Sequence, residues 1–176
     1  MKKLLFILML LPLYTLAQNC PPKGDSKEQK IIDADLLKNR SSCPDKSTAK
    51  KYDMALFMKD KINDNGLVYV EGYINEVKKS GTESCECHIK DESFLDYHIY
   101  VSSTLTSNKA LNQIVEVTRY SRAKNPQLDY NYVKSLVGKK VRIYGYTFMD
   151  AEHKGGVGNW RSGIEEIHPV FYIDKL

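Results

Sequence analysis

Two cysteines and a histidine are concentrated in one short segment of the chain. Cys85, Cys87 and His88 lie within four residues of one another. Thiolates and imidazoles are ligands for zinc and copper, so this segment is a candidate metal site. Structural zinc sites usually separate paired cysteines by two or more residues, whereas one residue separates these two. In an extended strand Cys85 and Cys87 would share a face and His88 would lie on the other.

The same cysteines could instead form disulfides. The chain has four of them, at positions 20, 43, 85 and 87, and four cysteines allow three pairings. Disulfides are the default in an exported protein. One pairing would join Cys20 to Cys43, and another would attach both N-terminal cysteines to the rest of the chain. A Cys85–Cys87 bridge would be strained. Disulfide and metal both stay open here.

Two further histidines extend the candidate metal site. His98 lies on the same face of a predicted strand as Asp96, and His168 belongs to another strand of the same sheet. Each histidine alone is typical of an exposed side chain with a hydrogen-bonded neighbour. Next to a carboxylate and a cysteine pair, a histidine could be a metal ligand or a proton carrier, and the set indicates such a role more strongly than any one member. The candidate ligands for zinc or copper are Cys85, Cys87, His88, His98 and His168.

A second group of residues is typical of ligand recognition. A glycine-rich loop at 155–161 contains Trp160, the only tryptophan, and Arg161, and both residue types are common in binding hot spots. The loop lacks the spacing of a phosphate-binding loop. Tyrosines and arginines on predicted strands could stack against sugars or bases. The candidate ligand-binding residues are Tyr100, Arg142, Tyr144, Trp160 and Arg161.

The N-terminal residues predict export. Lys2 and Lys3 precede an uncharged apolar run at 4–16, and small residues follow at a position that a signal peptidase reads. This run is too short to span a bilayer. We therefore expect a signal peptide at 1–17 and a periplasmic or extracellular protein with no stable membrane span. Loss of Lys2 and Lys3 leaves 24 of the 26 basic residues against 22 acidic ones.

The remaining chain predicts a mainly β protein preceded by a helical extension. Residues 18–65 read as an N-terminal extension with one or two short helices, and alternating hydrophobicity marks strands from residue 66 onward. A helix between the third and fourth of five strands is typical of an OB-fold, a five-stranded Greek-key barrel. A generic α+β sandwich is the alternative. The expected strands are 67–77, 96–101, 113–119, 139–148 and 164–173, and the expected helix is 126–137.

Several short motifs together resemble an uncharacterised family of small exported bacterial OB-fold-like proteins. The resemblance covers about residues 30–175. Its members tend to carry a tryptophan where Glu165 stands and a proline where Arg119 stands. The resemblance implies an OB-like core and no established activity. The motifs are Glu83-Ser84-Cys85, Cys87-His88, Asp96-Tyr97-His98-Ile99, Val115-Glu116-Val117-Thr118, Val141-Arg142-Ile143-Tyr144-Gly145, 150–153, Asn159-Trp160-Arg161 and Glu166-Ile167-His168-Pro169-Val170.

These observations predict an exported, non-enzymatic binding module for an unidentified ligand. The ligand could be an oligosaccharide, a single-stranded nucleic acid or a small molecule, and metal binding by zinc or copper is the alternative function. The formal charge of +4 comes with no run of five or more Lys or Arg, so the sequence predicts no strong basic patch for nucleic acid. A hydrolase using Asp96, His98 and Glu166 is a third hypothesis, and no nucleophile motif supports it.

Overall fold

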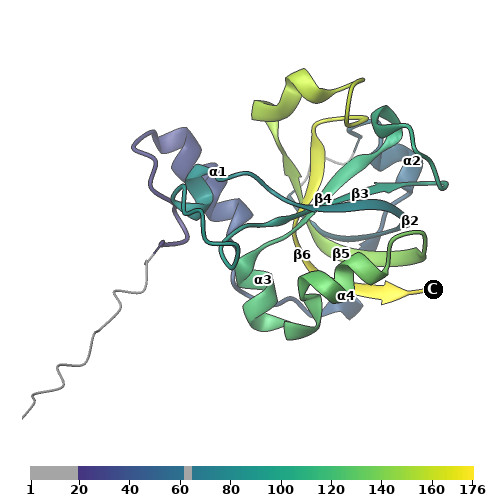
Figure 1. Cartoon of the computed structure of the whole chain (residues 1–176), viewed down its shortest axis with the longest axis horizontal. Coiled ribbons are helices and arrows are strands. Elements are labelled where there is room, and N and C mark those ends of the chain that lie inside the picture. Colours follow the sequence, from purple (N-terminus) through teal and green to yellow (C-terminus); the bar gives the residue numbers. More distant parts are fainter. Residues whose placement is uncertain (1–19, 62–64) are drawn as a thin grey trace, which may run out of the picture.

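Five strands close into a barrel in the computed structural model, which describes residues 20–61 and 65–176 (Figure 1). The barrel order is β2-β3-β4-β6-β5, and β5 pairs with β2 to close it. All neighbours are antiparallel except β4 and β6, which run parallel. This Greek-key order confirms the predicted OB-like barrel. The strands are β2 (Leu67–Lys79), β3 (Tyr97–Ser102), β4 (Gln113–Val117), β5 (Lys140–Met149) and β6 (Glu165–Lys175).

Alternation along the strands fills the barrel interior with β-branched side chains. Ile99 on β3, Val115 on β4 and Ile167 on β6 are fully buried in the core. Because successive side chains of a strand point to opposite faces, the neighbours of these residues point outward. At Gly72 in β2, a Cβ would lie 2.7 Å from the carbonyl oxygen of Ser102. Glycine therefore lets β2 approach that backbone, while the register shift occurs further along, between Ile74 and Glu76.

The connection from β4 to β5 differs in detail from the predicted single helix. It contains α3 (Arg119–Lys124), η4 (Pro126–Leu128) and α4 (Tyr130–Ser135). The strand predicted at 113–119 is β4, and it ends at Val117, two residues earlier than predicted. It ends there because Thr118 and Ser121 form a capping box that starts α3. Asp129 interrupts the helix expected at 126–137, since its side chain accepts hydrogen bonds from two backbone amides and starts α4. Gly138, with φ +79°, ends the segment, because glycine adopts this left-handed conformation without strain.

The described part of the N-terminal segment packs on the barrel and contributes to its core. It contains α1 (Gln29–Lys38), η1 (Lys46–Thr48), β1 (Lys50–Lys51) and α2 (Met54–Phe57). β1 pairs in parallel with β2, and Met54 and Phe57 are buried in the hydrophobic core. The predicted division between an extension at 18–65 and a barrel at 66–176 therefore does not separate two cores. The predicted signal peptide at 1–17 lies outside the described residues.

Helix α1 covers the outside of the barrel with its charged face inward. It buries Asp35 and Lys38 while Leu36 remains 47% exposed. The helix lies beside η2 (Ser84–Glu86) in the β2–β3 connection (Figure 1). The remaining short helices are η3 (Lys109–Leu111) and η5 (Ala151–Gly156). Among the described residues, no helix has the length and hydrophobicity needed to cross a membrane.

Candidate metal centre

Five ionisable side chains gather on the outer face of β3, β4 and β6. They occupy strand positions that alternate with core residues, or the position just before β3, so they point away from the barrel interior. Four of them are at most 5% exposed, and the side chain of the fifth, His98, is 17% exposed. We call this group the polar cluster; its members are Asp96, His98, Glu116, Glu166 and His168.

The imidazole of His168 lies at the centre of the polar cluster. Its Nε2 atom is 3.5 Å from Oδ2 of Asp96. Its Nδ1 atom is 3.4 Å from Oε2 of Glu166 and 3.6 Å from Oε2 of Glu116. On the neighbouring strands, Nε2 of His98 lies 3.1 Å from Oε1 of Glu116. Donor atoms of Asp96, Glu116 and His168 all lie within 4.8 Å of one another, a spacing that a single cation could bridge.

Hydrogen bonding inside the polar cluster is incomplete. Among the described residues, buried Asp96 Oδ1 has no hydrogen-bond partner, and Nε2 of His98 and Nε2 of His168 face carboxylate oxygens at 3.1 Å and 3.5 Å without hydrogen-bond geometry. Buried polar atoms in native proteins are almost always hydrogen-bonded, so the missing hydrogen bonds in the polar cluster need an explanation. Nitrogen and oxygen donors of these types are zinc ligands, and the residues present therefore fit a metal ion.

Electrostatics inside the polar cluster favours protonated histidines when no metal is bound. Burial alone would lower the pKa of His98, but the adjacent Glu116 carboxylate outweighs it and raises that pKa to about 9. Burial alone would raise the pKa of Glu116, but His98 and His168 outweigh it and lower that pKa to about 2. The pKa of His168 lies well above its usual value, because burial is outweighed by the surrounding carboxylates. Protons thus supply the positive charge that this site needs.

Arg161 lies behind the polar cluster rather than on an exposed recognition loop. The side chain is 1% exposed, and its Nη2 atom is 2.8 Å from Oε1 of Glu166. Its Nη1 atom is 3.3 Å from Oδ2 of Asp150, which also contacts His153. Trp160 is half-buried, with its ring 5.7 Å from that of His153. Arg161 is therefore buried among its carboxylate partners instead of exposed on the loop, and its role in ligand binding stays a prediction.

The cysteines do not form the predicted ligand set. Cys87 forms a disulfide with Cys20 and therefore offers no thiolate to a metal. Cys85 is a free, buried thiol whose pKa is raised, first of all by burial. His88 is exposed and pairs weakly with Asp25, 3.8 Å away. Of the five predicted metal ligands, the polar cluster contains two, His98 and His168. The disulfide prediction is confirmed for one pair, which links the N-terminal segment to the β2–β3 connection.

The predicted ligand-binding residues lie apart. Tyr144 packs against Tyr69 with ring centroids 5.4 Å apart, and Arg142 lies over the same Tyr69 ring. Tyr100 pairs in register with Glu76, while Tyr144 pairs with Tyr69. These two register positions are separated along β2 by about 20 Å at the rise of an extended strand. The two tyrosines are 7% and 6% exposed, so the set predicted from sequence forms no common stacking surface.

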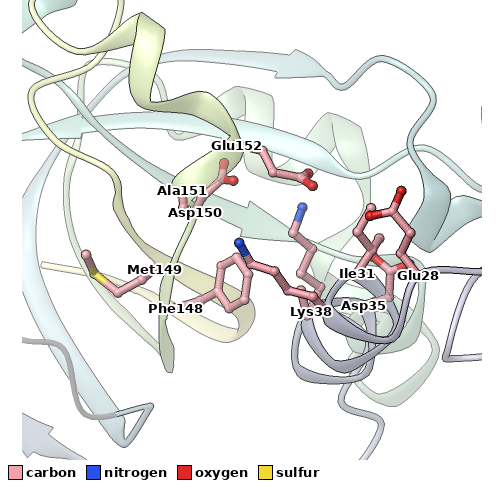
Figure 2. Close-up of a pocket in the computed structure, with 11 residues that line it drawn as sticks. Glu28, Ile31, Asp35, Lys38, Phe148, Met149, Asp150, Ala151 and Glu152 are labelled. Atoms are coloured by element: carbon pink, nitrogen blue, oxygen red, sulfur yellow. The ribbon is translucent and has the colours of Figure 1, made fainter. Parts of the chain in front are cut away.

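A cleft next to the polar cluster separates α1 from the end of β5 (Figure 2). Its volume is about 240 Å³, and Lys38, Phe148 and Asp150 contribute to its lining. The Lys38 side chain extends over the Phe148 ring, with Nζ 5.6 Å from the ring centroid. The Phe148 ring in turn packs against His168, with centroids 5.9 Å apart. The cleft is therefore separated from the polar cluster by one layer of side chains.

Comparison with family models, curated proteins and solved structures finds no match to this chain. The resemblance to exported OB-fold-like proteins stays a prediction. Its motifs nevertheless meet in space, since the segments with Asp96, Glu116 and His168 supply the polar cluster and the segment with Arg161 lies directly behind it.

Sequence reasoning assigned no ligand role to Glu116, although it forms the most contacts with the two clustered histidines. A signal was present, because this carboxylate lies between Val115 and Val117 on a strand that pairs with the strand of His98. Lys38 gave no such signal, since a lysine near the end of a helix is typical of a solvated position.

Proposed function

We propose that this protein is a metal-binding OB-like module whose polar cluster binds a divalent cation, zinc. The ligands would be Asp96, Glu116 and His168, whose donor atoms lie within 4.8 Å of one another, together with His98, which contacts Glu116. One observation carries the proposal: these side chains converge on a buried space in which Asp96 Oδ1 has no hydrogen-bond partner among the described residues. Zinc sites of this composition use imidazole nitrogen and carboxylate oxygen.

The charge balance of the buried region supports a cation. The fixed positive charge in contact with its carboxylates is the guanidinium of Arg161, while Lys38 is paired with Glu83 at 2.9 Å. Uncompensated buried charge is strongly unfavourable. Burial raises the pKa of Asp96 and of Glu166, so protons on histidines or carboxylates, or a divalent cation, must balance the site. The carboxylates buried in the polar cluster or against Arg161 are those of Asp96, Glu116, Asp150 and Glu166.

The donor types favour zinc over copper(I). Copper(I) is selected by soft thiolate and thioether ligands. Cys87 offers no thiolate because it is disulfide-bonded, and burial keeps Cys85 as a neutral thiol. Imidazole and carboxylate groups remain, and they suit zinc.

The location on the barrel also supports a binding role. β3 and β4 are the second and third strands of the barrel, and in OB-folds this face and its flanking loops bind ligands. The polar cluster lies on that face, between the β2–β3 connection and the β5–β6 connection. The sequence predicts an exported binding module with an unidentified ligand, and we propose that this ligand is the metal ion. A disulfide is compatible with an oxidising compartment, and we propose that the protein works outside the cytoplasm.

The test is the metal content of the oxidised protein without residues 1–17. We expect about one zinc per chain by elemental analysis after dialysis against zinc buffer and gel filtration. The Glu116→Gln variant should lose it, because an amide replaces the central carboxylate with little change of shape. His88→Gln is the matched control, since His88 is exposed and outside the polar cluster. Equal zinc in both variants, or none in the unmodified protein, would contradict the proposal. Far-ultraviolet circular dichroism checks that each variant is folded.

A further inference from the structure

We propose that residues 20–39, which include α1 and which we call the strap, form a redox-controlled cover over the polar cluster. Reduction of the Cys20–Cys87 disulfide would release the strap and open the site to solvent. The regulatory meaning of this device rests on the proposed metal site, whereas its opening can be measured without any metal.

The strap is tied to one side of the site, the β2–β3 connection. The disulfide joins Cys20 to Cys87. The side-chain amide of Asn39 donates to the carbonyl oxygens of Cys85 at 2.8 Å and of Pro22 at 3.0 Å. Ser84 donates from its hydroxyl to Asp35 at 2.9 Å. Both ends of the strap therefore meet the same connection.

A smaller set of contacts fixes the beginning of the strap to α3. The guanidinium of Arg119 and the hydroxyl of Tyr120 both donate to the carbonyl oxygen of Cys20. These bonds hold the residue next to the disulfide and do not reach α1. Their loss alone would leave the covalent tether in place.

Polar contacts, rather than an apolar face, hold α1 on the barrel. The helix buries Asp35 and Lys38, while Leu36 is 47% exposed and Ile31 is half-buried. Water can replace such polar contacts, so each contributes little net stability. The strap is joined to the chain at residue 39, and the disulfide adds a second covalent link at Cys20. This second link limits how far the strap can move and raises the effective concentration of its contacts. Loss of the disulfide should therefore favour release of the strap from the barrel more than loss of any single polar contact.

The opposite side of the strap has room for movement. There α1 faces the cleft of about 240 Å³ that separates it from the end of β5 (Figure 2). The contact across this side is Lys38 over the Phe148 ring, which in turn packs on His168. Lifting the strap away from the barrel would remove Lys38 from the Phe148 ring and uncover Cys85, whose sulfur lies within 4.8 Å of a carboxylate oxygen of Asp96 in the polar cluster.

Opening requires an external reductant. A dithiol supplies two electrons and two protons, the bond between the sulfurs of Cys20 and Cys87 breaks, two thiols form, and the reductant becomes a disulfide. The neighbouring thiol of Cys85 is a poor substitute, because the buried neutral thiol is not the nucleophilic form. The strap therefore responds to the redox state of the surroundings.

The direct test is the alkylation rate of Cys85, which is 1% exposed. In the Cys43→Ser background Cys85 is the single free thiol, and iodoacetamide labelling followed by mass spectrometry reads its exposure. Adding Cys20→Ser and Cys87→Ser should accelerate labelling about tenfold or more, since the tether is lost. Mild reduction of the Cys43→Ser protein should expose Cys85 as readily. Labelling rates within twofold of the oxidised protein would overturn the proposal.

Two controls separate opening of the strap from unfolding and from failure of the proposed function. Hydrogen exchange of the β4 amides should stay slow in the serine variants, because opening of the strap leaves the barrel intact. Fast exchange of these amides together with fast labelling of Cys85 would mean that the protein unfolds, and this result would also overturn the proposal. In the zinc-loaded protein, a chelator should remove zinc about tenfold faster after reduction. A protein that binds no zinc but exposes Cys85 on reduction would contradict the proposed function, while the proposal of a redox-controlled strap would still hold.

Discussion

The imidazole of His98 and the carboxylate of Glu116 face each other across β3 and β4, with Nε2 3.1 Å from Oε1. The strand register fixes this pair directly, because the two residues are cross-strand partners. His168 approaches Glu116 from β6 on the opposite side. Three neighbouring strands thus present one imidazole, one carboxylate and one imidazole in a row, on rigid elements suited to holding a metal.

The metal-free protein should lose stability as pH rises above neutral. The pKa of His98 is about 9 in the folded state and about 6.5 when unfolded. Because the folded pKa is the higher one, this stabilisation is complete below pH 6.5 and disappears as pH rises through about 9. Urea unfolding of chelator-treated protein between pH 6 and 9.5 should show the decline, and His98→Gln should reduce it. Stability that rises over this range would contradict the assigned ion pair.

Zinc binding should release protons. The high pKa of His98, set by Glu116 against the effect of burial, means that the imidazole is protonated at pH 7.5 without metal, and a zinc-bound imidazole must be neutral. We expect release of about one proton or more per zinc at this pH. Titration calorimetry in two buffers of different ionisation enthalpy measures the number. Binding enthalpies that do not depend on the buffer would show that no proton leaves, contrary to this expectation.

Replacing Arg161 by methionine should destabilise the protein strongly. The guanidinium is buried between Asp150 and Glu166, so its removal takes away the buried positive charge that these two carboxylates share. Breaking a buried ion pair typically costs about 3–5 kcal/mol. Urea denaturation measures the loss. Arg142→Met is the matched control, since Arg142 pairs with Glu71 at the surface; comparable losses in both variants would argue against a buried role for Arg161.

Phe57→Ala should test whether α2 belongs to the barrel core. Phe57 is fully buried with barrel residues, and truncation of a buried phenylalanine costs about 3–5 kcal/mol. Its neighbour Leu56 is 49% exposed, so Leu56→Ala provides a control with a much smaller effect. Both can be compared by thermal or urea unfolding. A near-neutral Phe57→Ala variant would indicate a barrel that is independent of residues 20–61.

The barrel could be predicted from the sequence because its strands alternate over most of their length. Ile99, Val115 and Ile167 mark an inner face that few other arrangements would bury. The ends of elements were less predictable. Thr118 reads as a strand residue by its β propensity, yet its hydrogen bonds with Ser121 end β4 and begin α3.

The candidate site was only partly predictable, because long-range packing buries it. Histidines such as His98 and His168 are potential ligands in any setting. Glu116 and Lys38, by contrast, are typical of solvated charges in the sequence, yet both are buried in the structure. The pairing of Cys20 with Cys87 spans 67 residues of sequence and has no local signature. The pairing removes Cys87 from the ligand set, so the sequence alone pointed to the wrong sulfur ligands.

X-ray absorption spectroscopy of the zinc-loaded, oxidised protein tests the central claim most directly. A site made by His98, Glu116 and His168 predicts nitrogen and oxygen neighbours at about 2.0–2.2 Å from zinc, with imidazole scattering beyond them. A sulfur neighbour at about 2.3 Å would contradict this assignment, because it would place Cys85 or another thiolate on the metal in place of the polar cluster.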